Sequence, residues 1–236
     1  MPTAAQRERA LRILDALAAR FPEAAIELDY HHGEPWQLLV AVVLSAQSTD
    51  VGVNKVTPAL FAALPDVRAF AAATPQQVEG YIKTLGLFRN KAKSLVGAAQ
   101  AIVAKHGGQV PRARALLEEL PGVGTKSAAV IVANAFGEPA IAVDTHVGRV
   151  SKRMGLTAND DPWKVEQDLT ALLPKERLLE AHHVLIWHGR RICHARNPAC
   201  GECPVERMCK KVAVATPTTK LTKPARPAQR ARAPRR

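Results

Sequence analysis

The chain has 236 residues, and 47% of them are hydrophobic, which is enough apolar side chain for a folded core. Its net charge of +12 favours a polyanionic partner, and it contains no run of about 18 apolar residues that would predict a membrane span. Residues 1–20 are amphipathic and charged throughout and lack the apolar segment of a signal peptide, so we expect an intracellular protein.

Helical signals follow one another along the chain, whereas no stretch has convincing strand character. The signals are capping side chains, prolines at the first helical position and glycines at helix ends. They predict an all-α fold, with helices over about residues 3–21, 35–44, 50–61, 67–72, 75–86, 90–107, 114–120, 125–137, 145–155, 162–173 and 176–188.

The last segment, residues 212–236, differs in composition from the rest of the chain. It contains four prolines and no aromatic residue, and its apolar side chains are short. Such a segment cannot bury enough apolar surface to fold alone, so we predict a disordered basic tail. The tail carries seven of the twelve net positive charges, so the remaining residues, at +5, are only mildly basic.

A short turn, Leu120-Pro121-Gly122-Val123-Gly124, separates two predicted helices. We expect Gly122 and Gly124 to take backbone angles that a Cβ forbids, which gives a tight turn. The turn ends at a helix N-terminus, where free backbone N–H groups can hold a phosphate. Lys126 follows two residues later and Asp144 eighteen residues further on, so an amine and a carboxylate form a candidate catalytic pair. An ordinary helix–turn–helix with a surface lysine is the alternative interpretation.

The four cysteines all fall within seventeen residues, with the spacing C-x6-C-x2-C-x5-C. Two disulfides do not suit an intracellular chain with a large core. Four clustered thiolates suit either a zinc ion or a [4Fe–4S] cluster, and zinc sites often use two closely spaced pairs. The sequence has one such pair, which disfavours zinc. The four residues are Cys193, Cys200, Cys203 and Cys209.

These motifs together resemble one known family. The turn at residues 120–124 with Lys126, followed by Val143-Asp144-Thr145-His146, resembles the helix–hairpin–helix of DNA glycosylases, and most closely the endonuclease III family. The resemblance covers about residues 5–211. The cysteine spacing is also that of the family, which implies a structural [4Fe–4S] cluster bound by the four cysteines.

The resemblance implies a fold of two lobes with the active site in the cleft between them. A six-helix domain, residues 28–138, would contain the helix–hairpin–helix. A second helical domain would combine residues 1–27 with residues 139–211 and would hold the cluster loop, residues 193–209.

The activity that the resemblance implies is that of a bifunctional DNA glycosylase and abasic-site lyase, which removes oxidised pyrimidines from damaged double-stranded DNA in base excision repair. The Lys126 amine would attack C1′ and form a Schiff base, and β-elimination would then nick the strand. Asp144 would stabilise the cationic sugar or accept a proton, and could cap a helix as well.

The damaged base must leave the stack, and another side chain must fill the gap. The resemblance assigns this role to Gln47 and Leu87. It implies a monomer that acts in the cytoplasm, associated with the nucleoid. The other residues that it places at the DNA are Gly122, Val123, Gly124, Thr125, His146 and Arg196.

Two alternatives belong to other functional classes. A monofunctional glycosylase, similar to the adenine glycosylases with the same cysteine spacing, would lack the hairpin lysine, so Lys126 argues against it. A non-catalytic helix–hairpin–helix would only grip phosphate, and it would need neither Asp144 nor the four cysteines.

Overall fold

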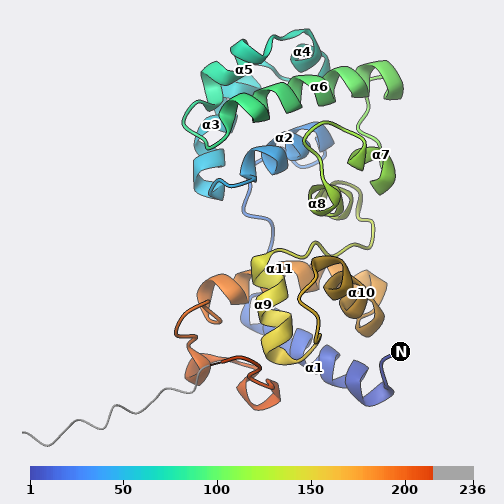
Figure 1. Cartoon of the computed structure of the whole chain (residues 1–236), viewed down its shortest axis with the longest axis vertical. Coiled ribbons are helices and arrows are strands. Elements are labelled where there is room, and N and C mark those ends of the chain that lie inside the picture. Colours follow the sequence, from blue (N-terminus) through green and yellow to red (C-terminus); the bar gives the residue numbers. More distant parts are fainter. Residues whose placement is uncertain (215–236) are drawn as a thin grey trace, which may run out of the picture.

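The computed structural model describes residues 1–214, and every regular element in this range is helical (Figure 1). The predicted all-α fold is confirmed. Most of the predicted tail, residues 215–236, lies outside the described residues. In the described part of the chain no helix is both long and apolar enough to cross a membrane. The α-helices are α1 (Ala4–Arg20), α2 (Pro35–Ser45), α3 (Asp50–Ala63), α4 (Val67–Ala72), α5 (Pro75–Ile82), α6 (Phe88–His106), α7 (Arg114–Glu118), α8 (Thr125–Phe136), α9 (Thr145–Met154), α10 (Pro162–Leu172) and α11 (Leu178–Arg191).

The helix boundaries follow local capping chemistry. Thr3 and Thr74 each form a capping box with a glutamine three residues later, which satisfies free N–H groups at the starts of α1 and α5. The start of α6 differs from the prediction: the helix begins at Phe88 rather than Asn90, because Leu87 takes a left-handed conformation and serves as the N-cap. Helix α5 ends at Ile82, before the predicted stop at Gly86.

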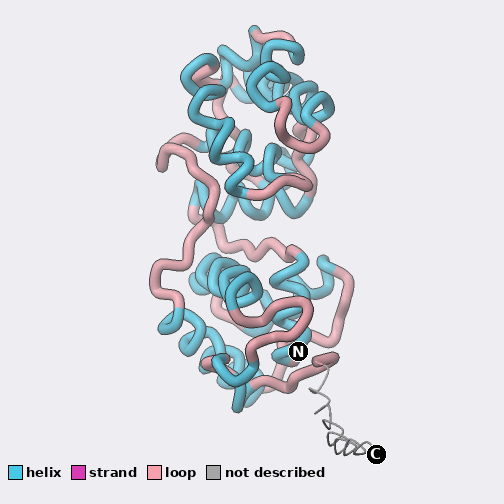
Figure 2. Tube along the Cα trace, turned by 90° about the vertical axis from the view of Figure 1, so that its left-hand side faces the viewer, coloured by secondary structure: helices cyan, strands magenta, loops and turns pink. Residues whose placement is uncertain are grey.

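The helices pack around two separate hydrophobic cores. The first core centres on α2, which is buried from Trp36 to Leu44, and includes residues of α3 to α8. The second core contains residues of α1, α9, α10 and α11. Figures 1 and 2 show the corresponding upper and lower lobes, joined by two extended segments.

The two connecting segments are short, and their side chains are shared between the lobes. Ala140 and Ala142 pack in the first core, whereas Ile141 between them packs in the second. In the other segment, the carbonyl of Ala25 accepts a hydrogen bond from Nε1 of Trp187 on α11 at 3.0 Å. The change of core at these segments supports the domain boundaries that the family resemblance implied, and we propose that division as the domain organisation.

Candidate active site and cluster loop

A cavity of about 380 Å³ lies between the two lobes. The first lobe contributes the α2–α3 turn and the start of α8 to its lining, and the second contributes the start of α9 and one face of α11. The cavity forms the cleft that was expected between the lobes. Five residues of the predicted motifs meet here: Gln47, Lys126, Asp144, Thr145 and His146 all line it.

The glycine hairpin positions Lys126. Gly122 has φ +80°, and a Cβ on it would lie 2.6 Å from the Cβ of Ser94 on α6, so this position requires glycine on two grounds. Gly124 is the N-cap of α8, with φ −93°, and a Cβ added to it would have nothing within 4 Å. The expectation of a forbidden backbone angle is therefore confirmed for Gly122 and wrong for Gly124. Lys126 is the second residue of α8, and it is exposed.

Asp144 is the N-cap of α9. Its Oδ1 accepts hydrogen bonds from the backbone N–H groups of His146 at 2.8 Å and Val147 at 2.7 Å. One face of the carboxylate therefore belongs to the helix, while the residue also lines the cleft. His146 lies beside it, and burial, together with the positive charge of Arg149 and Arg190, lowers the pKa of the imidazole against the opposing effect of Asp144.

Two adjacent histidines of α11, which no sequence motif singled out, also line the cleft. The Nδ1 of His182 lies 3.0 Å from the carbonyl of Ala142, and the Nε2 of His183 lies 3.1 Å from Oδ1 of Asn134. Because both imidazoles are buried, their pKa values fall to about 4. They therefore line the site as neutral groups near neutral pH. The signal that could have found them is a pair of polar residues on the apolar face of a helix.

The two residues assigned to the gap left by a flipped base both have left-handed backbone conformations. Gln47 has φ 54° and Leu87 has φ 56°, values that are unusual for residues other than glycine. Leu87 is 54% exposed and lies outside the cleft lining. The two turns touch, since a Cβ on Gly86 would lie 3.3 Å from the carbonyl oxygen of Gln47.

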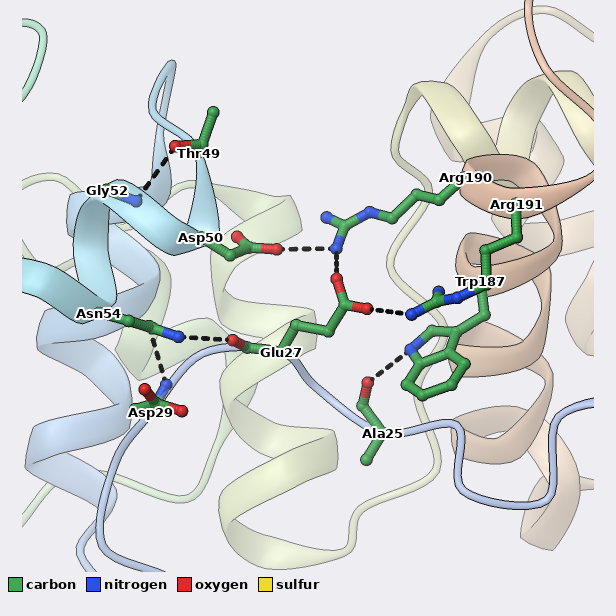
Figure 3. Close-up of polar contacts among 10 residues, drawn as sticks. All are labelled: Ala25, Glu27, Asp29, Thr49, Asp50, Gly52, Asn54, Trp187, Arg190 and Arg191. Carbon is green, nitrogen blue, oxygen red and sulfur yellow. Dashed lines mark hydrogen bonds and ion pairs between the residues drawn. The ribbon is translucent and has the colours of Figure 1, made fainter.

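An ion-pair network joins the lobes at the edge of the cleft (Figure 3). Glu27 pairs with Arg190 and, at 2.8 Å, with Arg191, and Arg190 also pairs with Asp50 of α3 at 2.8 Å. The backbone carbonyl of Glu27 accepts a hydrogen bond from Asn54 at 2.9 Å. Burial raises the pKa of the Glu27 carboxyl, but the two arginines outweigh it, and the pKa lies below its usual value. The network links α3, the first connecting segment and α11.

The four cysteines line a second, small cavity of about 20 Å³ in the second lobe. Each thiol is half-buried. Nowhere in residues 1–214 do three His, Cys, Asp or Glu side chains converge closely enough to hold one metal ion. Several donors face the sulfurs: Arg153 Nη1 lies 3.4 Å from Cys193 Sγ, and the backbone N–H of Lys211 lies 3.4 Å from Cys209 Sγ. Four thiolates with such donors suit an iron–sulfur cluster.

The remaining predicted DNA contacts lie outside the cleft lining. Val123 is buried in the first core, and Gly122, Gly124 and Thr125 are exposed on the hairpin. Arg196 is exposed on the cluster loop. The structure therefore brings the hairpin lysine, the aspartate and Gln47 together, and it leaves the hairpin glycines, Leu87 and Arg196 at separate surface positions.

Two protein families match this chain. Residues 40–175 match the HhH-GPD superfamily of base excision DNA repair proteins. Residues 193–209, the span of the four cysteines, match the iron–sulfur binding domain of endonuclease III. The fold, the cleft and the hairpin thus define a helix–hairpin–helix base excision repair protein, and the predicted iron–sulfur cofactor is confirmed.

Individual relatives narrow this class. The chain is 47% identical over 207 residues to endonuclease III of Synechocystis sp., which covers 87% of this chain and 94% of the relative. It is 41% identical over 203 residues to endonuclease III of Escherichia coli, with 86% and 95% covered. A solved trapped endonuclease III–DNA covalent intermediate superposes with a TM-score of 0.82 at 43% identity, over 89% of this chain and 97% of that chain.

The chain belongs to the endonuclease III family. It is therefore a DNA-binding enzyme of base excision repair, a DNA glycosylase and abasic-site lyase, as the resemblance of its motifs predicted. A thermostable thymine-DNA glycosylase at 23% identity has a TM-score of 0.79, which reflects the shared fold.

Proposed function

We propose that Lys126 is the nucleophile of this enzyme, that Asp144 assists it, and that the substrate is double-stranded DNA carrying an oxidised pyrimidine. The observation that carries the proposal is that Lys126 and Asp144, which start helices in different lobes, line one cleft. A covalent DNA intermediate has been trapped for a solved endonuclease III that is 43% identical to this chain, which supports a nucleophilic route.

In the proposed reaction Lys126 Nζ forms a bond to C1′ while the bond from C1′ to the base breaks. The base leaves with the electron pair and takes up a proton. Opening of the sugar ring gives a Schiff base between Lys126 and C1′, and loss of a C2′ proton then expels the 3′ phosphate. Asp144 accepts the proton that the attacking amine releases, and its charge stabilises the cationic sugar.

Each other predicted DNA contact has a proposed role that suits its position. The hairpin residues Gly122, Val123, Gly124 and Thr125 present the N-terminal N–H groups of α8 to a DNA phosphate, because a helix N-terminus favours an anion. Gln47 and Leu87 fill the gap that the flipped base leaves. The remaining two contacts, both to the DNA backbone, are His146 beside Asp144 and Arg196 on the cluster loop.

The cluster loop supports DNA binding rather than catalysis. Cys193, Cys200, Cys203 and Cys209 would ligate the cluster, which supplies a rigid structural anchor when bound. Arg149 and Arg153 of α9 donate to the loop carbonyls of Cys193 at 3.0 Å and Ala195 at 2.8 Å, so the loop is held to the helix that Asp144 caps. We further propose that the enzyme acts as a monomer.

Borohydride trapping tests the proposal. Wild-type protein should form a stable crosslink to DNA, because borohydride reduces the Schiff base. Lys126→Gln should bind the same DNA but form no crosslink and no nick, since it lacks the amine. Lys93→Gln, an exposed lysine of α6 that does not line the cleft, serves as the control and should behave as wild type.

Undiminished trapping by Lys126→Gln would place the nucleophile elsewhere. Base release by the wild type without any trapping would favour the monofunctional alternative. A panel of duplexes, each with one defined lesion, then identifies the preferred damaged base.

A further inference from the structure

Lys91 of α6 is a lysine buried beneath the DNA-facing turns of the first lobe, with 5% of its surface exposed. Its Nζ donates hydrogen bonds to the carbonyl of Leu44 and to the hydroxyl of Ser48, each at 2.8 Å. Both acceptors are neutral groups. Burial lowers the pKa of the Lys91 amine, so the ammonium group depends on these two hydrogen bonds for the solvation it has lost.

The side chain of Lys91 forms hydrogen bonds to the C-terminus of α2 and to the turn that follows it. Leu44 belongs to the last turn of α2, where carbonyls lack partners within the helix and the helix dipole is negative. Helix α2 has no basic residue in its own last turn, so Lys91 supplies the missing cation from another helix. The segment between the two acceptors contains Gln47, whose left-handed backbone is costly for a residue with a Cβ.

The backbone of Lys91 holds the other turn. Its N–H donates to the carbonyl of Leu87 at 3.0 Å, in the first turn of α6. The backbone of Leu87 has a left-handed conformation, and no side chain caps α6 at this end. Since Gly86 lies against the carbonyl of Gln47, the two turns are in contact. Lys91 is bonded to one of them through its side chain and to the other through the first backbone hydrogen bond of α6.

We propose that Lys91 is a positioning residue that fixes the Gln47 turn and the Leu87 turn in one relative arrangement, so that both side chains enter the DNA stack together. The proposal rests on the roles given to Gln47 and Leu87 under the proposed function. Lys91 touches neither the reacting atoms nor the surface of the cleft. Its contribution is to make the insertion of two separate side chains a single, preorganised event, which lowers the cost of holding a base outside the duplex.

The test compares two substrates, of which only the first requires a base to be unstacked. Lys91→Met keeps the apolar stem but loses the charge and the donors. On duplex DNA with an oxidised pyrimidine its single-turnover excision should slow by about tenfold or more, the size expected when a charge-assisted hydrogen bond is lost. On a single strand with a preformed abasic site, cleavage should fall by less than about threefold, and borohydride trapping should persist, because Lys126 is unaffected.

Matched variants separate positioning from general damage. Lys93→Met, two residues along the same helix and exposed, should behave as wild type on both substrates. Lys91→Arg, which keeps the charge and donors, should restore part of the duplex activity. If Lys91→Met does not fold, Ser48→Ala removes one of the two acceptors and should give a smaller loss of the same kind. A 2-aminopurine beside the lesion reports unstacking directly through its fluorescence, which should rise less with Lys91→Met than with wild type.

Double variants decide whether Lys91 acts through the turns. The double variant Lys91→Met/Gln47→Ala should excise the base at a rate within about threefold of the slower single variant, because both changes disable the same event. Fully additive losses would overturn the proposal, as would an equal loss on the two substrates. Normal duplex excision by Gln47→Ala and Leu87→Ala would remove the insertion roles and this inference with them, while leaving the Lys126 chemistry intact.

Discussion

Asp144 Oδ1 accepts a hydrogen bond from the backbone N–H of His146 at 2.8 Å, which anchors the carboxylate at the start of α9. The same oxygen accepts a second bond, from the N–H of Val147. Within residues 1–214 the other oxygen, Oδ2, has no hydrogen-bond partner. One oxygen of Asp144 therefore caps α9, and the second is available to a substrate in the cleft.

Substitution of Asp144 can separate these two roles. Asp144→Asn retains a capping oxygen, so the free energy of unfolding should change by less than about 0.5 kcal/mol. Cleavage of an abasic site should fall about a hundredfold, because the cationic sugar loses its electrostatic partner. Asp144→Ala should lose the activity and also about 1 kcal/mol of stability. Urea unfolding and single-turnover cleavage measure the two effects, and wild-type cleavage by Asp144→Asn would show that the carboxylate serves the helix alone.

The two hairpin glycines should respond differently to alanine. Gly122→Ala should destabilise the protein by about 1–3 kcal/mol, because the added Cβ meets Ser94 and the positive φ becomes strained. Gly124→Ala should leave stability nearly unchanged, since its backbone is ordinary and its Cβ has room. If the hairpin backbone approaches a phosphate, Gly124→Ala should nevertheless weaken DNA binding. Thermal unfolding and DNA titration distinguish the outcomes, and unchanged binding by Gly124→Ala would leave this glycine without a role in DNA contact.

The buried histidines of α11 make stability depend on pH. The pKa values of His182 and His183 are about 4 in the folded protein and near the ordinary value of 6.5 in the unfolded chain. Between pH 4 and pH 6.5 the unfolded chain binds more protons than the folded protein. The stability that these two histidines contribute by staying neutral is therefore fully present above pH 6.5 and is lost as the pH falls toward 4. The total loss should reach several kcal/mol, since one pKa unit corresponds to about 1.4 kcal/mol.

Urea unfolding at a series of pH values tests this prediction. His183→Gln should flatten the pH dependence, because a neutral amide replaces one of the two titrating groups. His31→Gln, an exposed histidine of the first lobe, should leave it unchanged. A variant that lacks His183 but keeps the full wild-type slope would assign the acid sensitivity to other groups.

The helices and the hairpin were predictable because their signals are local. Thr74 begins a helix through a side chain three residues away, and Gly122 needs its own backbone angle. The boundary at Leu87 was missed because nothing in the composition of a leucine indicates a left-handed N-cap. The backbone angle of Gly124 was also predicted wrongly, because its φ of −93° is one that any residue can adopt.

The contacts that join distant parts of the chain could not be predicted from one sequence. Glu27 and Arg190 are 163 residues apart, and neither has a spacing that points to the other. The periodicity of α6 predicts that position 91 faces inward. It does not predict which carbonyl a lysine at that position will bind. The family resemblance predicted the cleft and its motif residues, whereas the histidines His182 and His183 and the ion pairs at its edge were found only in the structure.

Removal of the iron–sulfur cluster should loosen one defined segment. Among residues 193–209 only Val205 is fully buried, and the regular structure is limited to the short turns Cys200–Glu202 and Glu206–Met208. With so little core of its own, the loop depends on bonds from its cysteines to the cluster.

The intact protein should be yellow-brown, with broad absorbance near ~400 nm from the thiolate–iron bonds. After oxidative removal of the cluster, trypsin should cut at Arg196 and Arg207 much faster, while the first lobe, with its separate core, resists digestion. DNA binding should weaken, because Arg196 is carried on the loosened loop, and the remaining complex should be less sensitive to salt. Reconstitution with iron and sulfide should restore both properties. Equal digestion before and after removal would mean that protein contacts, such as those from Arg149 and Arg153, hold the loop without the cluster.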